Sequence, residues 1–113
     1  MREEIFSFIK EFYGVEPDYP FASSPDAAVL RHPSGKWFGI MMQVPKNKLG
    51  LLGEEPVDII NLKRDPMQGL ADGERIFPAY HMNKEHWISV LLNGSVPFEE
   101  LKALIAMSYD RIK

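Results

Sequence analysis

Two amphipathic helix patterns, one at each end of the chain, enclose a run of β-prone segments. The first pattern places apolar residues at i, i+3, i+4 and i+7, namely Ile5, Phe8, Ile9 and Phe12. It predicts a helix over residues 5–13 that ends at Gly14. The second pattern follows Pro97 and aligns Phe98, Leu101, Ile105, Ser108 and Ile112. Each helix has one apolar face that must pack against another layer.

The middle of the chain alternates β-favouring runs with turn residues. Strands are predicted over 27–32, 37–44, 57–62, 76–80 and 87–92. The turn-rich 33–36 predicts a first hairpin, and the last two strands form a second one. Asp65-Pro66 predicts a short helix to about Asp72, ended by Gly73, whereas 45–56 is irregular. The order α-β-β-β-α-β-β-α predicts a two-layer α+β sandwich: an antiparallel sheet of about five strands with helices on one face.

Composition narrows the class of protein. The 113 residues are 45% hydrophobic and 12% aromatic, which suits a single domain over 1–113 with a real core. Cysteine is absent, so disulfides and thiolate chemistry are excluded. No apolar run approaches the roughly 20 residues that span a bilayer. The amino terminus is charged, so we expect a soluble, cytoplasmic protein without membrane contact.

The segment from Tyr80 to Val90, YHMNKEHWISV, resembles the signature of the bacterial MmcQ/YjbR-like family. Further matching pieces occur in family order: Tyr19-Pro20-Phe21, Gly35-Lys36-Trp37-Phe38, Leu62-Lys63-Arg64-Asp65-Pro66 and Ser108-Tyr109. The resemblance covers nearly the whole chain, although the loop after Asp18 and the second helix look short. It implies a CyaY-like (frataxin-like) fold and DNA binding through a "double wing" arrangement, with no established reaction. Since a fold does not carry function, neither iron binding nor a partner is transferred.

Charge placement favours a local anionic contact. The chain carries a net charge of -3, yet residues 27–53 contain four basic residues and no acidic one, which leaves -7 elsewhere. The candidate nucleic-acid-binding residues are Arg31, Lys36, Lys46, Lys48, Lys63 and Lys84. Against DNA stands the acidic pI of about 5.6. The alternative interpretation is an ordinary solvated sheet face with lysines that guard the edges against aggregation.

A second hypothesis is a protein or small-molecule interaction module without catalysis. In the strand 87–92, Ile88, Val90 and Leu92 form a wholly aliphatic face that is predicted to pack under the helices. Trp87 then points to the opposite, uncovered sheet face as an exposed aromatic residue. The candidate patch comprises the family-signature residues and both tryptophans: His81, Met82, Asn83, Lys84, His86, Trp87 and Trp37.

Metal and catalytic sites are not predicted. His81 and His86 are five positions apart, which fits neither one face of a helix nor one face of a strand, and Lys84 between them repels a cation. A structural turn, with His and Asn side chains bonding nearby backbone, is the default. No catalytic motif occurs, so an enzyme is the third hypothesis. We expect no cofactor, and a monomer or weak homodimer.

Overall fold

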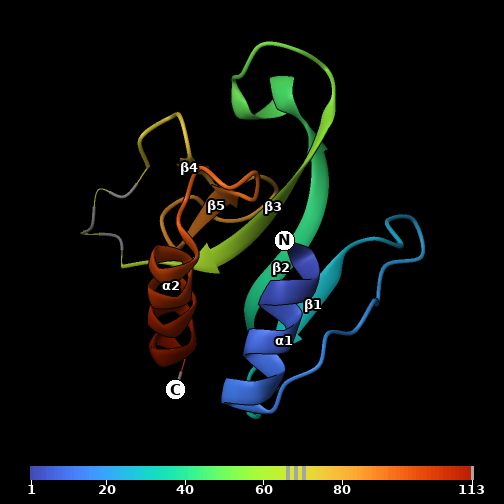
Figure 1. Cartoon of the computed structure of the whole chain (residues 1–113), viewed down its shortest axis with the longest axis vertical. Helices are drawn as coiled ribbons and strands as arrows, with labels where there is room; N and C mark the ends of the chain where they lie inside the picture. The colour runs from blue at the N-terminus through green and yellow to red at the C-terminus, as the bar shows by residue number, and fades with distance from the viewer. Residues whose placement is uncertain (66, 68, 70, 113) are drawn as a thin grey trace.

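The computed structural model describes residues 1–65, 67, 69 and 71–112. Its elements are α1 (Arg2–Tyr13), β1 (Ala28–Arg31), β2 (Trp37–Pro45), the 3-10 helix η1 (Lys46–Leu49), β3 (Pro56–Lys63), β4 (Ile76–Pro78), β5 (Trp87–Leu91) and α2 (Phe98–Arg111) (Figure 1). The strands form one antiparallel sheet in the order β1-β2-β3-β5-β4. The predicted α+β class, its five strands and both hairpins are therefore confirmed.

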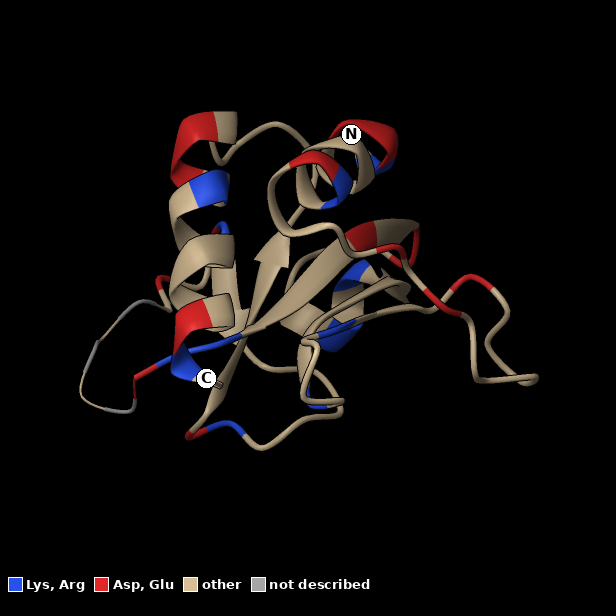
Figure 2. Cartoon of the chain, turned by 90° about the horizontal axis from the view of Figure 1, so that it is seen from below, with Lys and Arg blue, Asp and Glu red and all other residues tan. Residues whose placement is uncertain are grey.

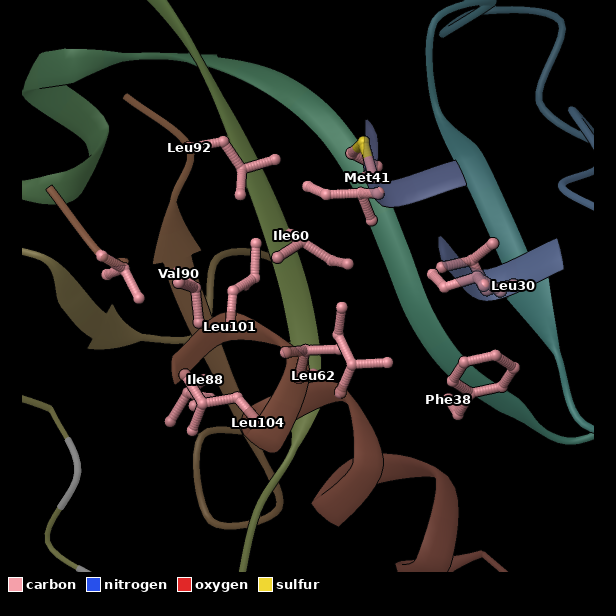
Figure 3. Packing of buried hydrophobic residues seen from close by; sticks show 14 of the residues in the cluster. Leu30, Phe38, Met41, Ile60, Leu62, Ile88, Val90, Leu92, Leu101 and Leu104 are labelled. Atoms are coloured by element: carbon pink, nitrogen blue, oxygen red, sulfur yellow. The ribbon is translucent and has the colours of Figure 1, made fainter. Parts of the chain in front are cut away.

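Both helices lie on the same side of the sheet (Figure 2). Between them and the strands is an aliphatic core in which Ile88, Val90 and Leu92 are buried, as predicted from the alternation in β5. Figure 3 shows Leu101 and Leu104 of α2 lying among these sheet residues. Burying each such side chain contributes about 1.5 to 3 kcal/mol, so this layer supplies most of the apolar stabilisation.

The helix ends follow the sequence. Gly14 adopts a left-handed conformation (φ 68°), and its N–H donates to the Lys10 carbonyl, which ends α1 at the predicted position. Acidic residues occupy the first turn of each helix, where they oppose the positive end of the helix dipole: Glu3, Glu4, Glu99 and Glu100. Within the described residues, no helix has the length and apolar character needed to cross a membrane.

Ser108 fastens α2 to the sheet. Its hydroxyl donates a hydrogen bond to the Phe38 carbonyl at the start of β2 and accepts one from the Lys63 N–H at the end of β3 (2.9 Å). Ser108 is fully buried, so losing either bond would leave a polar group without water. One side chain of α2 thus satisfies the backbone of two strands at once.

The helix predicted over 66–72 is not formed by the residues described there. Pro66, Gln68 and Leu70 lie outside the described residues, and the described residues between Asp65 and Gly73 are not helical. The Asp65 carboxylate accepts a hydrogen bond from the Met67 N–H (2.9 Å), and no helix follows at the described residues Met67, Gly69, Ala71 and Asp72.

The segment 45–56 differs from the prediction in a smaller way. It contains the 3-10 helix η1, which ends at Gly50 in a left-handed conformation (φ 82°). Leu49 and Leu51 of this segment pack against a second buried cluster on the face of the sheet away from α1 and α2. That face is therefore covered in part by the chain itself.

Candidate functional site

A closed ring of hydrogen bonds crosses the face of the sheet opposite the helices. The Tyr80 N–H donates to Ser89 Oγ (2.9 Å), Ser89 Oγ donates to Asn61 Oδ1, and Asn61 Nδ2 donates to the Tyr80 carbonyl (3.1 Å). Asn61 of β3 and Ser89 of β5 are register partners, and both are fully buried. Because each polar group in the ring has its partner, this buried network fixes the Tyr80 backbone against the sheet.

His81, directly after the ring, has a strained backbone. Its φ of 61° is left-handed, and it is the one non-glycine residue with a positive φ in the described part of the chain. The left-handed conformation costs an L-residue about 1 kcal/mol or more, and such positions persist where the surroundings hold them. Its imidazole lies 3.9 Å from the Tyr80 ring, centroid to centroid. The buried ring of bonds therefore fixes the backbone directly before His81, whose side chain is exposed.

A cavity of about 260 Å³ opens beside His81. Three segments far apart in sequence enclose it: the loop 21–27, β2 and the turn at 80–81. Its lining residues are Phe21, Ser23, Ser24, Asp26, Ala27, Met42, Gln43, Tyr80 and His81. Sites for drug-sized ligands typically have about 300 to 1,000 Å³, so this cavity suits a smaller molecule.

Asp26 is the acidic residue in the cavity wall, and the protein holds it in place. Its Oδ2 accepts a hydrogen bond from the Gln43 N–H (3.1 Å), which extends the edge of β2 beyond the start of β1. Its backbone carbonyl accepts a hydrogen bond from the Arg2 guanidinium (2.8 Å). The cavity therefore combines one positioned carboxylate with an imidazole, hydroxyls, aromatic rings and a thioether.

The prediction that Trp87 is exposed was wrong. Trp87 is 7% exposed, and its strand partner Lys63 places its ammonium 5.5 Å from the centre of the indole ring. The sheet face on which Trp87 was expected to be exposed carries a buried apolar cluster made of Val44, Ile59, Phe77 and Leu91. The sheet face predicted to be uncovered is thus covered in large part, which the alternation within one strand does not reveal.

Trp37 remains the more accessible tryptophan. It is half-buried, and its ring meets Phe21 of the cavity wall edge to face at 5.9 Å. The Arg31 guanidinium lies 5.6 Å from the centre of the Trp37 ring. Trp37 therefore borders the cavity through Phe21, whereas Trp87 does not line it.

The candidate DNA-binding cations are mostly engaged within the protein. Arg31 forms an ion pair with Asp18 (2.6 Å), and Lys46 forms one with Glu55 (3.3 Å). Lys84 Nζ donates to the Ala79 carbonyl (3.0 Å). These contacts orient the cations toward the chain's own acceptors.

The same cations are also separated in space. Lys36 precedes β2 and lies near the β1–β2 turn, whereas Lys46 and Lys48 follow β2 in η1, at the other end of the strand (Figure 1). At about 3.3 Å per residue, the ends of this strand are about 26 Å apart. Lysines and arginines alternate with acidic residues over several elements (Figure 2). The local charge of residues 27–53 is therefore divided between two ends of the molecule.

The family-signature residues form a turn before β5. Asn83 accepts backbone hydrogen bonds from His86 (3.3 Å) and Trp87 (3.0 Å), and its side chain accepts one from the Glu85 N–H (2.8 Å). His86 is exposed and Met82 is half-buried. Within the described residues, no group of three or more His, Asp or Glu side chains is arranged to hold a metal ion. Of the signature segment 80–90, Tyr80 and His81 line the cavity.

Asn61 and Ser89 were not among the predicted site residues. Each interrupts a run of apolar residues in a strand that the sheet buries, Asn61 between Ile60 and Leu62 and Ser89 between Ile88 and Val90. Since buried polar groups are almost always hydrogen-bonded, each interruption is a sequence signal for a buried polar partner, although it does not identify that partner. Their shared partner, the backbone of Tyr80, is visible in the structure alone.

A family model described as YjbR matches residues 10–111 of this chain. The chain therefore belongs to the YjbR family. It is similar to the uncharacterised protein YyaQ of Bacillus subtilis (strain 168), with 48% identity over 115 residues that cover 99% of this chain and 98% of YyaQ. It is also similar to the uncharacterised protein YbdF of Escherichia coli O157:H7, with 41% identity over 59 residues, 50% of this chain and 48% of YbdF.

Solved structures support the same fold. A crystal structure of a Pseudomonas syringae protein has a TM-score of 0.95 and 40% identity to this chain, and the match covers 100% of this chain and 99% of that one. A crystal structure of a Deinococcus radiodurans protein with the DUF419 domain has a TM-score of 0.74 and 25% identity, covering 99% and 78%. The α+β architecture is thus shared with solved structures. None of the relatives described above carries an activity in its name.

Proposed function

We propose that this protein is a small-ligand-binding module whose site is the cavity beside His81. The observation that carries the proposal is the strained His81, held by the buried ring of Asn61, Ser89 and the Tyr80 backbone at the wall of a cavity of about 260 Å³. Backbone strain that the surroundings over-determine concentrates at functional sites. Here the strain is maintained by buried polar groups, which are costly to leave unsatisfied and are otherwise avoided in a core.

The cavity wall suits recognition of a ligand more than a reaction on it. Phe21, Met42 and Tyr80 supply apolar contact, while Asp26 and His81 supply hydrogen-bonding groups that would fix orientation. The hydroxyls of Ser23 and Ser24 line the same wall, but no hydrogen bond from either to a histidine or carboxylate occurs among the described residues. A nucleophile with its base is the arrangement that covalent catalysis requires.

Blocking the cavity tests the proposal. A fragment library would be screened by ligand-observed NMR against the wild type, Ser24→Trp and Leu52→Trp. Ser24 lies in the exposed cavity wall, whereas Leu52 is 97% exposed and lies outside the lining. We expect Ser24→Trp to abolish binding of the fragments that the wild type binds, and Leu52→Trp to retain it. Equal binding by the wild type and Ser24→Trp would overturn the proposal.

DNA binding through the first hairpin, and the frataxin-like description of the fold, stay predictions. The separation of Lys36 from Lys46 and Lys48, and the ion pairs of Arg31 and Lys46, weigh against a continuous phosphate-binding surface. Fluorescence anisotropy with duplex and single-stranded DNA at two salt concentrations tests the idea. A small-ligand module should give no signal at micromolar protein, whereas binding that falls steeply with salt would favour DNA.

A further inference from the structure

We infer that the cavity beside His81 takes a small organic cation, an ammonium or guanidinium group carried on an apolar body. The inference rests on the proposed ligand-binding function and names the chemical class of its ligand. It follows from three features of the wall: the sign of its charge, the position of Asp26, and the aromatic rings around them.

The charge of the wall favours a cation. Asp26 contributes a carboxylate, and no lysine or arginine is among the described residues that line the cavity. Asp26 is exposed, so a ligand cation would pair with its carboxylate with partial screening by water. An anionic ligand would meet Asp26 without a compensating cation, whereas a ligand ammonium would meet an opposite charge.

Asp26 also has acceptor capacity to spare. A carboxylate has about four lone-pair positions. Within the described residues, the carboxylate of Asp26 accepts one hydrogen bond, from the Gln43 N–H, and forms no ion pair. The nearby Arg2 bonds the Asp26 backbone carbonyl and directs its other terminal nitrogen toward Asp58 (3.7 Å). The bond to Gln43 therefore orients the carboxylate while leaving most of its acceptor sites for a ligand.

The apolar part of the wall is suited to the same class of ligand. Phe21 and Tyr80 offer aromatic rings, whose negative faces attract cations, and Met42 offers a flexible thioether that adapts to irregular shapes. The molecule uses the same combination next to the cavity. There, Arg31 is paired with Asp18 (2.6 Å) and lies 5.6 Å from the centre of the Trp37 ring. The cavity repeats this carboxylate-and-aromatic arrangement without a cation of its own among the lining residues described.

Three probes with one phenyl ring and different charges separate this inference from the proposed function. Benzylamine, benzyl alcohol and benzoate would be titrated into ¹⁵N-labelled protein and followed through the amide shifts of Ser24, Gln43 and His81. We expect benzylamine to bind up to about fivefold more tightly than benzyl alcohol, which is the largest ratio that an exposed ion pair typically supplies. Benzoate should bind most weakly.

Matched variants assign the preference to Asp26. Asp26→Asn keeps an oxygen to accept the Gln43 N–H but removes the charge, so benzylamine and benzyl alcohol should then bind with similar affinity. Glu54→Gln removes an exposed carboxylate that does not line the cavity and should leave the ratio unchanged. If benzyl alcohol binds the wild type as tightly as benzylamine, with the same shifts, the cation inference fails and the ligand-binding function stands. If none of the three probes shifts these amides at about 10 mM, both fail.

Discussion

The two faces of the sheet are built on different principles. Beneath α1 and α2, an apolar cluster joins the sheet to both helices and contains seventeen buried residues among those that the structure describes, with the buried hydroxyl of Ser108 bonded to the Phe38 carbonyl beside it. On the opposite face, the described part of the chain forms a smaller apolar cluster of four buried residues, and beside it lies the ring of Asn61, Ser89 and Tyr80 with the cavity at His81. The first face is arranged for stability. The second face buries fewer apolar side chains, and its buried polar groups bond the turn at Tyr80 and His81, where the backbone is strained.

Matched isoleucine truncations on the two faces should show the largest effect. Ile88 and Ile59 are both buried, the first under the helices and the second in the smaller cluster. We expect Ile88→Ala to lower the free energy of unfolding by about 4 kcal/mol and Ile59→Ala by about 2 kcal/mol, because the smaller cluster collapses more easily around the lost volume. Urea denaturation measures both. A larger loss for Ile59→Ala would reverse the assignment of stability to the helix-covered face.

Breaking the polar ring should have the next largest effect. Asn61→Ala leaves the Ser89 hydroxyl proton without its acceptor and the Tyr80 carbonyl without its donor, and Ser89→Ala leaves Asn61 Oδ1 without its donor and the Tyr80 N–H without its acceptor. Each should cost about 2 kcal/mol of unfolding free energy. Because both changes break one network, the double variant should cost less than the sum of the two, by about 1 kcal/mol or more. Strict additivity would show that the ring does not act as a unit.

Much of the fold was predictable because it depends on patterns of residues that are close in sequence. The periodicity of the two helices, the hairpin turn at 33–36 and the aliphatic alternation of Ile88, Val90 and Leu92 each depend on neighbours in sequence. The helix expected over 66–72 failed because Asp65-Pro66 fits a turn as well as a helix start, and the side chain of Asp65 bonds Met67 in that turn. Cap residues alone did not distinguish the two.

The candidate site was less predictable because its parts come together through tertiary contacts. Met42 and His81 line the same cavity although thirty-nine positions separate them. Trp87 is buried on the face of the sheet away from the helices, where Leu49, Leu51 and Tyr80 pack against a separate apolar cluster, and no pattern within β5 indicates either fact. His81 was among the residues of the predicted patch, and it lines the cavity. Its strained conformation and its polar support required the three-dimensional arrangement.

Relieving the strain at His81 should have a smaller effect of opposite sign. Glycine adopts a positive φ without steric cost but loses more chain entropy on folding. We therefore expect His81→Gly to raise the free energy of unfolding by about 0.5 kcal/mol, while His81→Ala, which keeps the strain, does not raise it. Both should weaken ligand binding. Thermal unfolding of the wild type and the two variants measures these changes in stability. A His81→Gly protein less stable than the wild type would contradict the claim that the His81 backbone is strained.

The smallest expected effect concerns the edge of the sheet next to β4. The backbone N–H groups of Arg75, Ile76 and Glu74 donate to Asp72, and they hold the pKa of this carboxyl well below its ordinary value of 3.8. A carboxyl whose pKa is lower in the folded state stabilises the fold above its unfolded-state pKa, and this contribution is lost as the pH falls further. Asp72→Asn should therefore flatten the loss of stability below about pH 4. Urea unfolding at pH 7 and pH 3 tests this, and identical pH dependence in both proteins would contradict it.

The most direct test of the two-face account is where a small ligand binds. Intermolecular NOEs from the ring protons of benzylamine to the wild-type protein would report its position. We predict NOEs to the Met42 methyl group and the Tyr80 ring, on the cavity wall, and their loss in Asn61→Ala, where the turn at His81 is released. NOEs to Phe8 and Phe98 on the helix side, or NOEs at the cavity that persist unchanged in Asn61→Ala, would contradict it.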